Sequence, residues 1–464
     1  MVWKESEASV WVDDLDGAEK VFYNMSQAFS GLGKEHGSVY AVCKISVQNS
    51  DREASLETLL CDAWRNTRFE FPGLSVVADG STKEYVAATA ERVEHWVGQT
   101  FSVDAVHSAL DIVSTLHLRR LPCLIFLPPS SEVIFHCSHW RIDALGACMV
   151  LDRLFDLASQ GSSTRSIPQW DLEYQNLSPS LEDAFGSPYI CSPIMDSMAE
   201  AIRKRNFDTS YPSAGLPYNG DITTKPGRSR SQAIELTVQS TKDLVAACKT
   251  RGISVTAAVH AACAEAVFSR SKNNDHSYST VVSANMRGSL PVPQNDNTKT
   301  AYAYACGTYV TGITHTLRRA DNFATRSLQL TQAYRGSWAT MEYMTALRPI
   351  YKIHGEALAA IARSGTRLPA SNVTVSSLGI IEKYLRSDHG TIVVERFRLG
   401  SAILTRQPTL YIWTFHGRLT LSLDFNESYY NMDATTALLE SIRQFLEREL
   451  QLILEINKEA LLGQ

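Results

Sequence analysis

The sequence predicts an α/β protein built from two halves. Segments with strand-like patterns alternate with segments of helical periodicity along most of the chain, which is typical of mixed α/β layers. With 464 residues the chain is too long for one ordinary core, since domains usually hold about 100–200 residues. A stretch rich in Pro, Gly and Ser separates two parts of comparable size. We therefore expect an N-terminal half over residues 1–160, a crossover linker over 161–230 and a C-terminal half over 231–464.

The N-terminal half shows three strand-like segments and three helical ones, one of which is expected over 104–116. Residues 39–47, 121–127 and 132–138 are apolar runs of strand length, and residues 55–64 have the periodicity of an amphipathic helix. A further helix is expected directly after Asp143, because apolar residues recur there near helical spacing, at Leu145, Val150, Leu151, Leu154 and Phe155.

The C-terminal half repeats this mixture. Helices are expected over residues 241–252, where a glycine ends the pattern, over the Ala-rich stretch 257–270, and from Asp433 towards the C-terminus. Strands are expected between these helices, at 279–283, 304–313, 371–376, 409–415 and 419–425.

Composition excludes several classes of protein. A hydrophobic content of 44% with 20% charged residues is that of a globular chain, and a net charge of −5 argues against nucleic-acid binding. The nine cysteines are odd in number and none forms a Cys-x-x-Cys pair, so we expect neither a disulfide framework nor a zinc site. The charged N-terminus lacks a signal peptide's apolar core, and no run reaches the ~18 apolar residues of a membrane span. A cytoplasmic location without membrane attachment is the expectation.

The residues that suggest chemistry are His139 and Asp143. An apolar strand ends just before His139, Asp143 follows four residues later, and a helix is expected to begin immediately after it. An imidazole presented at the end of a strand can deprotonate a hydroxyl or amine nucleophile. The small residues Ser138, Ala144 and Gly146 leave room for a substrate to approach. This pattern indicates an enzyme.

Other interpretations of this pattern remain open. Asp143 could act only as a helix N-cap, with His139 a hydrogen-bonded core residue. A second His-x-x-x-Asp match, His107 to Asp111, falls within a helix expected over 104–116 and is taken as structural. His136 and His139 lie three residues apart, so their side chains would leave a strand on opposite faces, and we expect no metal site.

Several motifs resemble the CoA-dependent acyltransferase superfamily, which includes plant BAHD enzymes, condensation domains of peptide synthetases and fungal trichothecene-type O-acetyltransferases. Ser138-His-Trp-Arg-Ile-Asp-Ala144 is similar to the family's His-His-x-x-x-Asp-Gly signature. Further matches follow in the family's order, at 283–291 (Asn-x-Arg with a later Pro), 304–310 and 423–429. A segment of the crossover beginning at Asp171 looks most similar to the fungal acetyltransferases.

The chain departs from the family pattern at identifiable positions. Ser138 stands where condensation domains have the first His, which fits acyl transfer better than peptide synthesis. Ala144 replaces the final Gly and adds one methyl group beside His139. The Asp-Phe-Gly-Trp-Gly sequence of the plant enzymes is absent, so a plant-type assignment is not expected.

The resemblance implies a chloramphenicol-acetyltransferase-like fold, with an active-site channel between two similar halves. It implies that His139 is the general base towards the hydroxyl of a secondary metabolite, and that Asp143 pairs with Arg287 of the second half to support the site. Ser138, Ala144 and Gly146 would line the channel or the oxyanion region. No cofactor would be bound permanently, and an acyl-CoA, most simply acetyl-CoA, would be the co-substrate of a monomeric enzyme.

Three alternatives stay open at this point. An acyl carrier protein could deliver the acyl group in place of CoA. A condensation-like scaffold could use His139 for cyclisation or a pericyclic step without any acyl donor. The chain could also be a binding relic without chemistry, although it keeps both His139 and Asp143.

Overall fold

The computed structural model describes residues 3–48, 55–161, 170, 172–186, 192–207, 213–272, 277–291, 302–335, 343, 346–353 and 370–458. The chain forms two compact units, and each consists of three segments. The first unit holds Met1–Pro188, Arg287–Tyr309 and Ile381–Ser401, and the second holds Tyr189–Met286, Val310–Ile380 and Ala402–Gln464. The predicted boundaries at 160 and 230 treat each half as one continuous stretch, and the structure differs from them because two segments of the predicted C-terminal half fold into the first unit.

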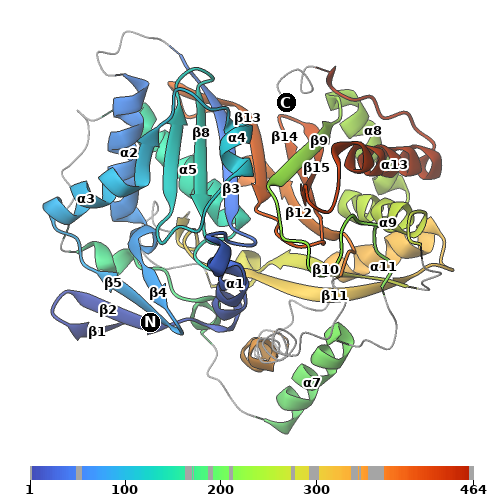
Figure 1. Ribbon diagram of the computed structural model, residues 1–464, viewed down its shortest axis with the longest axis horizontal. Helices are drawn as coiled ribbons and strands as arrows, with labels where there is room; N and C mark the ends of the chain where they lie inside the picture. Colours follow the sequence, from blue (N-terminus) through green and yellow to red (C-terminus); the bar gives the residue numbers. More distant parts are fainter. Residues whose placement is uncertain are drawn as a thin grey trace. The chain divides into compact units, whose positions relative to one another are not determined.

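The first unit is built around a five-stranded mixed sheet in the order β13-β3-β8-β7-β6 (Figure 1). Its strands are β3 (Val39–Val47), β6 (Phe101–Val103), β7 (Cys123–Leu127), β8 (Glu132–Cys137) and β13 (Ile392–Ser401). β6 and β7 are parallel and the other neighbours antiparallel. β13 comes from the segment Ile381–Ser401 and pairs with β3 along its whole length, which is why that segment belongs to this unit.

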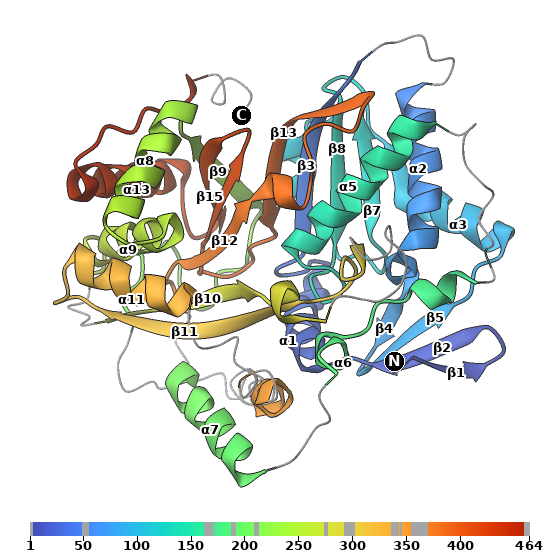
Figure 2. The ribbon, with the colours of Figure 1, turned by 180° about the vertical axis from the view of Figure 1, so that it is seen from behind.

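Helices cover both faces of this sheet. α4 (Ala109–Ser114) packs on the face formed by Tyr40, Val42, Ile125 and Ile134. α5 (Ala144–Gln160), α2 (Leu56–Glu70) and α3 (Ala90–Thr100) lie on the opposite face, seen from behind in Figure 2. Because both faces are covered, the central strands are apolar throughout instead of alternating.

A second, four-stranded antiparallel sheet in the first unit was not predicted. It has the order β1-β2-β5-β4, with β1 (Lys4–Glu7), β2 (Val10–Asp14), β4 (Val77–Asp79) and β5 (Thr82–Val86). These strands are short and largely polar, so they lack the apolar pattern by which strands are recognised. α1 (Gly17–Gln27) follows β2 and begins with a capping box between Asp16 and Glu19.

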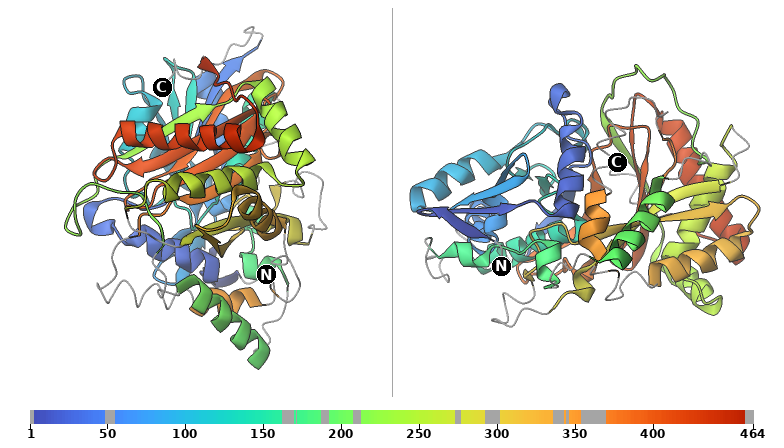
Figure 3. Two further views of the ribbon diagram at one scale, coloured as in Figure 1. Left: turned by 90° about the vertical axis from the view of Figure 1, so that its right-hand side faces the viewer. Right: turned by 90° about the horizontal axis from the view of Figure 1, so that it is seen from below.

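The second unit is a six-stranded sheet in the order β11-β10-β12-β14-β15-β9. The strands are β9 (Ser229–Glu235), β10 (Ser277–Asn285), β11 (Val310–Arg318), β12 (Thr374–Ile380), β14 (Thr409–Phe415) and β15 (Arg418–Asn426). Its helices include α8 (Val238–Thr250), α9 (Val255–Phe268), α11 (Phe323–Arg335) and α13 (Met432–Leu450), and Figure 3 shows α13 and α9 lying across the sheet.

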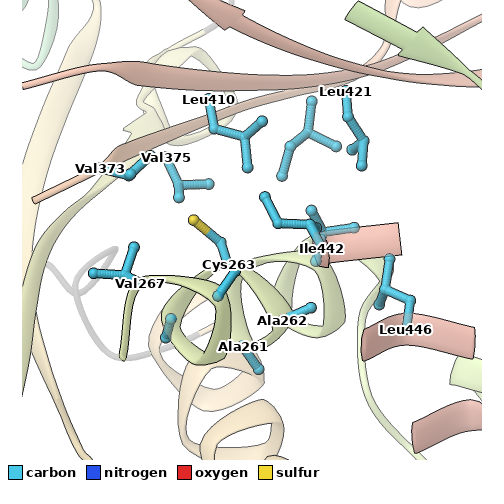
Figure 4. Packing of buried hydrophobic residues seen from close by; sticks show 14 of the residues in the cluster. Ala261, Ala262, Cys263, Val267, Val373, Val375, Leu410, Leu421, Ile442 and Leu446 are labelled. Carbon is cyan, nitrogen blue, oxygen red and sulfur yellow. The ribbon is translucent and has the colours of Figure 1, made fainter. Parts of the chain in front are cut away.

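The core of the second unit lies between α9 and the sheet. Cys263 and Val267 of α9 face Val375 and Leu410 of the strands, with Ile442 of α13 beside them (Figure 4). The Ala-rich sequence of α9 follows from this position, because small side chains let the helix lie close to the sheet and to its neighbours.

The remaining elements are short, apart from α7. They are η1 (Ser30–Leu32), η2 (Pro72–Ser75), η3 (Glu173–Asn176), α6 (Leu181–Ala184), α7 (Pro193–Phe207), η4 (Arg287–Ser289) and η6 (Ile381–Lys383). η3, α6 and α7 fall within the predicted linker, whose residues 162–169, 171, 187–191 and 208–212 lie outside the described part, including the Asp171 quoted for the resemblance. No helix in the described ranges is long and apolar enough to cross a membrane.

Two predicted elements begin later than expected. The strand predicted over 304–313 starts only at Val310, and the residues before it form an irregular segment. The helix predicted over 104–116 starts at Ala109, because Ser108 caps it in a capping box with Asp111. His107 therefore precedes the helix and does not stack on Asp111 along one helix face. Its side chain is 61% exposed and its Nδ1 lies 2.9 Å from Asp104.

Candidate active site

His139 stands in the tight turn between a strand and a helix. β8 ends at Cys137, and the amides of Arg141 and Ile142 donate to the Ser138 carbonyl at 3.1 and 3.4 Å, which closes the turn. α5 then begins at Ala144, the first residue after the cap. The sequence predicted this order of strand, turn and helix.

The His139 ring lies flat against the ring of Phe22 from α1. The two ring centroids are 3.8 Å apart and the planes differ by 1°. Nδ1 of His139 is buried and has no hydrogen-bond partner in the described part of the chain. Burial lowers the pKa of His139 below its ordinary value, although the charge of Asp143 acts in the opposite direction. The imidazole is therefore neutral at neutral pH and able to accept a proton.

Asp143 is occupied by three donors. Its Oδ1 accepts from the Gly146 amide at 2.9 Å, and its Oδ2 accepts from Arg287 Nη1 at 3.0 Å and from the Tyr309 amide at 2.9 Å. The carboxylate is 1% exposed, and no bond joins it to the His139 ring among those the structure gives. The structure thus contains both the N-cap and the arginine pair. The supporting role assigned to Asp143 and Arg287 stays a prediction.

Arg287 belongs to the first unit, whereas the sequence placed it in the second half. Besides Asp143 it contacts its own segment, where Nε donates to the Tyr304 carbonyl at 3.0 Å and the guanidinium lies 5.1 Å from the centre of the Tyr309 ring. With 8% side-chain exposure, this arginine is buried against the loop that carries His139.

The irregular segment before β11 holds the backbone of the turn that carries His139, residues 138–142, which we call the histidine turn. The Thr308 hydroxyl lies 2.9 Å from the carbonyl oxygens of both His139 and Trp140, and Asp143 donates its amide to the Gly307 carbonyl at 3.2 Å. Gly307 has φ +155°, and a Cβ there would lie 2.5 Å from the Tyr309 ring. Only glycine fits this position. These contacts explain why the residues before Val310 are not a strand.

The residues predicted for the channel or oxyanion region differ in whether their hydrogen-bond donors are already used. The Ser138 hydroxyl donates to Glu35, and the Gly146 amide is taken by Asp143. A Cβ on Gly146 would collide with the Ala305 carbonyl oxygen, so this glycine allows close packing against the Ala305 backbone. Ala144 is the first residue of α5, and an amide at that position has no acceptor inside its helix. The Ala144 amide is therefore a candidate donor to an oxyanion.

Glu35 is a residue of this neighbourhood that the sequence did not reveal. It is 2% exposed, and its Oε2 accepts the Ser138 hydroxyl at 2.9 Å. Burial raises the pKa of Glu35 to about 7, against the opposing effects of the Ser138 bond and the charge of Arg141. No pattern within the sequence around residue 35 distinguishes it from an ordinary loop glutamate.

His136 takes no part in the His139 site. It is 1% exposed within β8, both ring nitrogens lack partners in the described part of the chain, and burial lowers its pKa to about 3. Within the described ranges, no group of three or more His, Cys, Asp or Glu side chains is arranged to hold a metal ion.

Comparisons with known proteins agree with the resemblance. The chain is 42% identical over 461 residues to O-acetyltransferase pigM of Monascus ruber, covering 98% of this chain and 88% of that protein. It is 34% identical to azaphilone biosynthesis cluster protein M of Aspergillus terreus, covering 96% of each. The solved trichothecene 15-O-acetyltransferase TRI3 of Fusarium sporotrichioides superposes with a TM-score of 0.80 at 17% identity, covering 96% of this chain and 97% of that one. No family model matches the chain.

Proposed function

Because the chain belongs to the family of fungal O-acetyltransferases that includes pigM of Monascus ruber, we propose that it transfers an acetyl group from acetyl-CoA to a hydroxyl of a secondary metabolite. Two relatives' names support the proposal: pigM is named as an O-acetyltransferase, and the Aspergillus terreus protein is named for azaphilone biosynthesis. The observation that carries the proposed chemistry is the His139 imidazole, which lies just after the end of β8, stacks on Phe22 and has a pKa lowered by burial.

In the proposed mechanism His139 acts through Nε2, since Nδ1 is the buried nitrogen. Nε2 removes the proton of the acceptor hydroxyl, and the resulting oxygen nucleophile attacks the thioester carbonyl. The tetrahedral intermediate then expels the CoA thiolate, which takes the proton back from the imidazolium. A positioned general base of this kind contributes about 10²–10⁴-fold to the rate. The amide of Ala144 is our candidate donor to the oxyanion.

Asp143 and Arg287 support the turn in this proposal and do not relay protons. The oxygens of Asp143 accept from Gly146, Tyr309 and Arg287, and among the described residues no bond joins the carboxylate to the His139 ring. A bidentate-capable guanidinium is suited to such a buried partner. The pair ties the start of α5 to the segment that contains Thr308.

The acceptor is proposed to be an oxygenated polyketide alcohol. The name of the Aspergillus terreus relative assigns that protein to azaphilone biosynthesis, which motivates this class. Acetyl is the proposed acyl group because pigM is named as an O-acetyltransferase. An acyl carrier protein remains the alternative source of the acyl group.

The test measures thiol release from acetyl-CoA with and without a panel of polyketide alcohols, together with product mass. We expect acceptor-dependent release, a product heavier by one acetyl group, and a loss of at least about 100-fold in His139→Ala. His107→Ala is the matched control, because it removes the histidine of the second His-x-x-x-Asp sequence, which is exposed and outside the site. A product of unchanged mass would indicate cyclisation, and full activity in His139→Ala would exclude the proposed base.

A further inference from the structure

A buried carboxyl group contacts the residue immediately before His139. Glu35 lies in the loop between η1 and β3, 103 positions from Ser138 in sequence, and accepts the Ser138 hydroxyl through Oε2 at 2.9 Å. Its second oxygen, Oε1, is buried and has no hydrogen-bond partner in the described part of the chain. Most buried polar side-chain atoms have at least one hydrogen-bond partner, so a buried carboxyl oxygen without one is unusual.

The surroundings of Glu35 hold little charge to compensate it. The groups that face it are the Cys137 thiol, at the end of β8, and the Arg141 guanidinium, in the turn between β8 and α5. Arg141 directs its donors at the backbone carbonyls of Gly73, Val76 and Arg120 and makes no bond to the carboxyl group. The neighbours Lys34 and His36 in its own loop are half-buried.

This environment makes an ionised Glu35 unfavourable for folding. Its pKa in the folded protein, about 7, lies above the ordinary value of 4.5. The stabilising effect of the neutral form is therefore complete below about pH 4.5 and is lost as the pH rises through about 7. At neutral pH and above, a glutamine of the same shape would stabilise the fold better. A destabilising group kept beside the proposed base is a candidate for a role in function.

We propose that Glu35 is a positioning residue for the proposed acyl transfer, whose carboxylate fixes the Ser138 hydroxyl and through it the backbone that presents His139. This inference rests on the proposed function. Two hydroxyl groups hold the backbone around His139: the Ser138 hydroxyl bonds to Glu35, and the Thr308 hydroxyl lies 2.9 Å from the carbonyls of His139 and Trp140. A bond to an ionised acceptor is roughly twice as strong as a neutral one, so the turn is held most firmly when Glu35 is charged.

A dependence of the rate on pH follows from this arrangement. Burial lowers the pKa of His139 below its ordinary value, so protonation of the imidazole limits the rate on the acid side of the Glu35 transition. Glu35 ionises at about pH 7, and kcat should rise through that pH as the Ser138 bond strengthens. The KM for acetyl-CoA should change little, since the effect acts on the placement of the base.

The experiment compares wild type with Glu35→Gln, Ser138→Ala and the control Glu132→Gln between pH 5.5 and 9. Glu132 also accepts a serine hydroxyl, that of Ser130 at 2.7 Å, but this pair is exposed at the opposite end of β8. We expect Glu35→Gln and Ser138→Ala to lose the step near pH 7 and roughly tenfold in kcat at pH 8, because a displaced base reacts slowly. Glu132→Gln should match wild type. The Tm of Glu35→Gln at pH 8 should equal or exceed that of wild type.

Each opposite result overturns the inference. A retained pH step in Glu35→Gln, full activity in Ser138→Ala, or a lowered Tm of Glu35→Gln at pH 8 would assign Glu35 a purely structural role. If wild type transfers no acyl group from any donor, the proposed function fails. Amide hydrogen exchange then tests, without any activity assay, whether Glu35 holds the backbone around His139. Faster exchange across residues 138–143 at pH 8 in Glu35→Gln, but not in Glu132→Gln, would support positioning, and equal exchange would refute it.

Discussion

Replacing Asp143 by asparagine tests whether this residue holds the turn or relays protons. The carboxylate accepts three bonds, from the Gly146 amide, the Tyr309 amide and the Arg287 guanidinium. An asparagine has one oxygen and one NH₂ group, so it cannot serve both sides. If the oxygen faces Gly146, the NH₂ group meets the donors of Arg287 and Tyr309. If it faces Arg287 and Tyr309, the helix cap is lost.

Both orientations of the asparagine side chain are expected to lower the free energy of unfolding. Losing a helix cap costs about 1 kcal/mol, and weakening a charge-assisted bond about 1.5–3 kcal/mol. Arg287, with 8% side-chain exposure, would also keep a buried charge without its partner, which increases the penalty. We therefore expect Asp143→Asn to lower the free energy of unfolding by about 3–4 kcal/mol, or about 6–16 °C in Tm if the affected unit unfolds as one cooperative domain.

Urea denaturation followed by circular dichroism measures this change, with kcat determined on the same samples. Asp111→Asn is the control, because Asp111 is the acid of the second His-x-x-x-Asp sequence and forms a capping box with Ser108 at an exposed helix start. A double-mutant cycle with Arg287→Met isolates the ion pair, whose coupling should exceed about 1 kcal/mol. Unchanged stability in Asp143→Asn together with a 100-fold fall in kcat would refute the supporting role and favour a relay.

Three further substitutions test the histidine turn. Phe22→Ala exposes the His139 ring, so the pKa of His139, now lowered by burial, should rise towards its ordinary value and move the acid limb of the kcat/KM profile to higher pH. An unmoved limb would mean that other groups bury the imidazole. Thr308→Val keeps the side-chain shape but removes the hydroxyl whose one proton is shared between the His139 and Trp140 carbonyls, and should lower stability by about 1 kcal/mol and kcat more than KM, measured by denaturation and steady-state kinetics. Gly307→Ala places a Cβ against the Tyr309 ring at φ +155°, and should cost at least about 2 kcal/mol in urea denaturation; wild-type stability would show that the ring can move aside.

The elements nearest to His139 could be predicted because their pattern is local. The apolar run 132–138 became β8 (Glu132–Cys137), and the helix expected after Asp143 became α5. Strand length, helical periodicity and a capping acid are all expressed within about 20 neighbouring residues. The strand predicted over 304–313 begins late because of contacts with a distant part of the chain. The backbone of Gly307 and Tyr309 bonds to Asp143, so these residues do not pair with a neighbouring strand.

The division of the chain could not be predicted in the same way. A cut into two continuous halves follows from composition, but β13 pairs with β3 across more than 340 residues of sequence and carries its segment into the first unit. Pairing between distant strands depends on which sheet edge is open, and no local sequence signal specifies this choice.

The sequence by itself determined which histidine is presented at a strand end, which acid caps the next helix, and, through the resemblance, that Arg287 meets that acid. Only the tertiary structure decided what holds the imidazole. Phe22 stacks on it, Glu35 reaches Ser138 from 103 positions away, and Thr308 holds the His139 carbonyl from 169 positions away. Periodicity records which face of an element is buried, whereas the identity of the group that covers that face is fixed only when distant segments pack together.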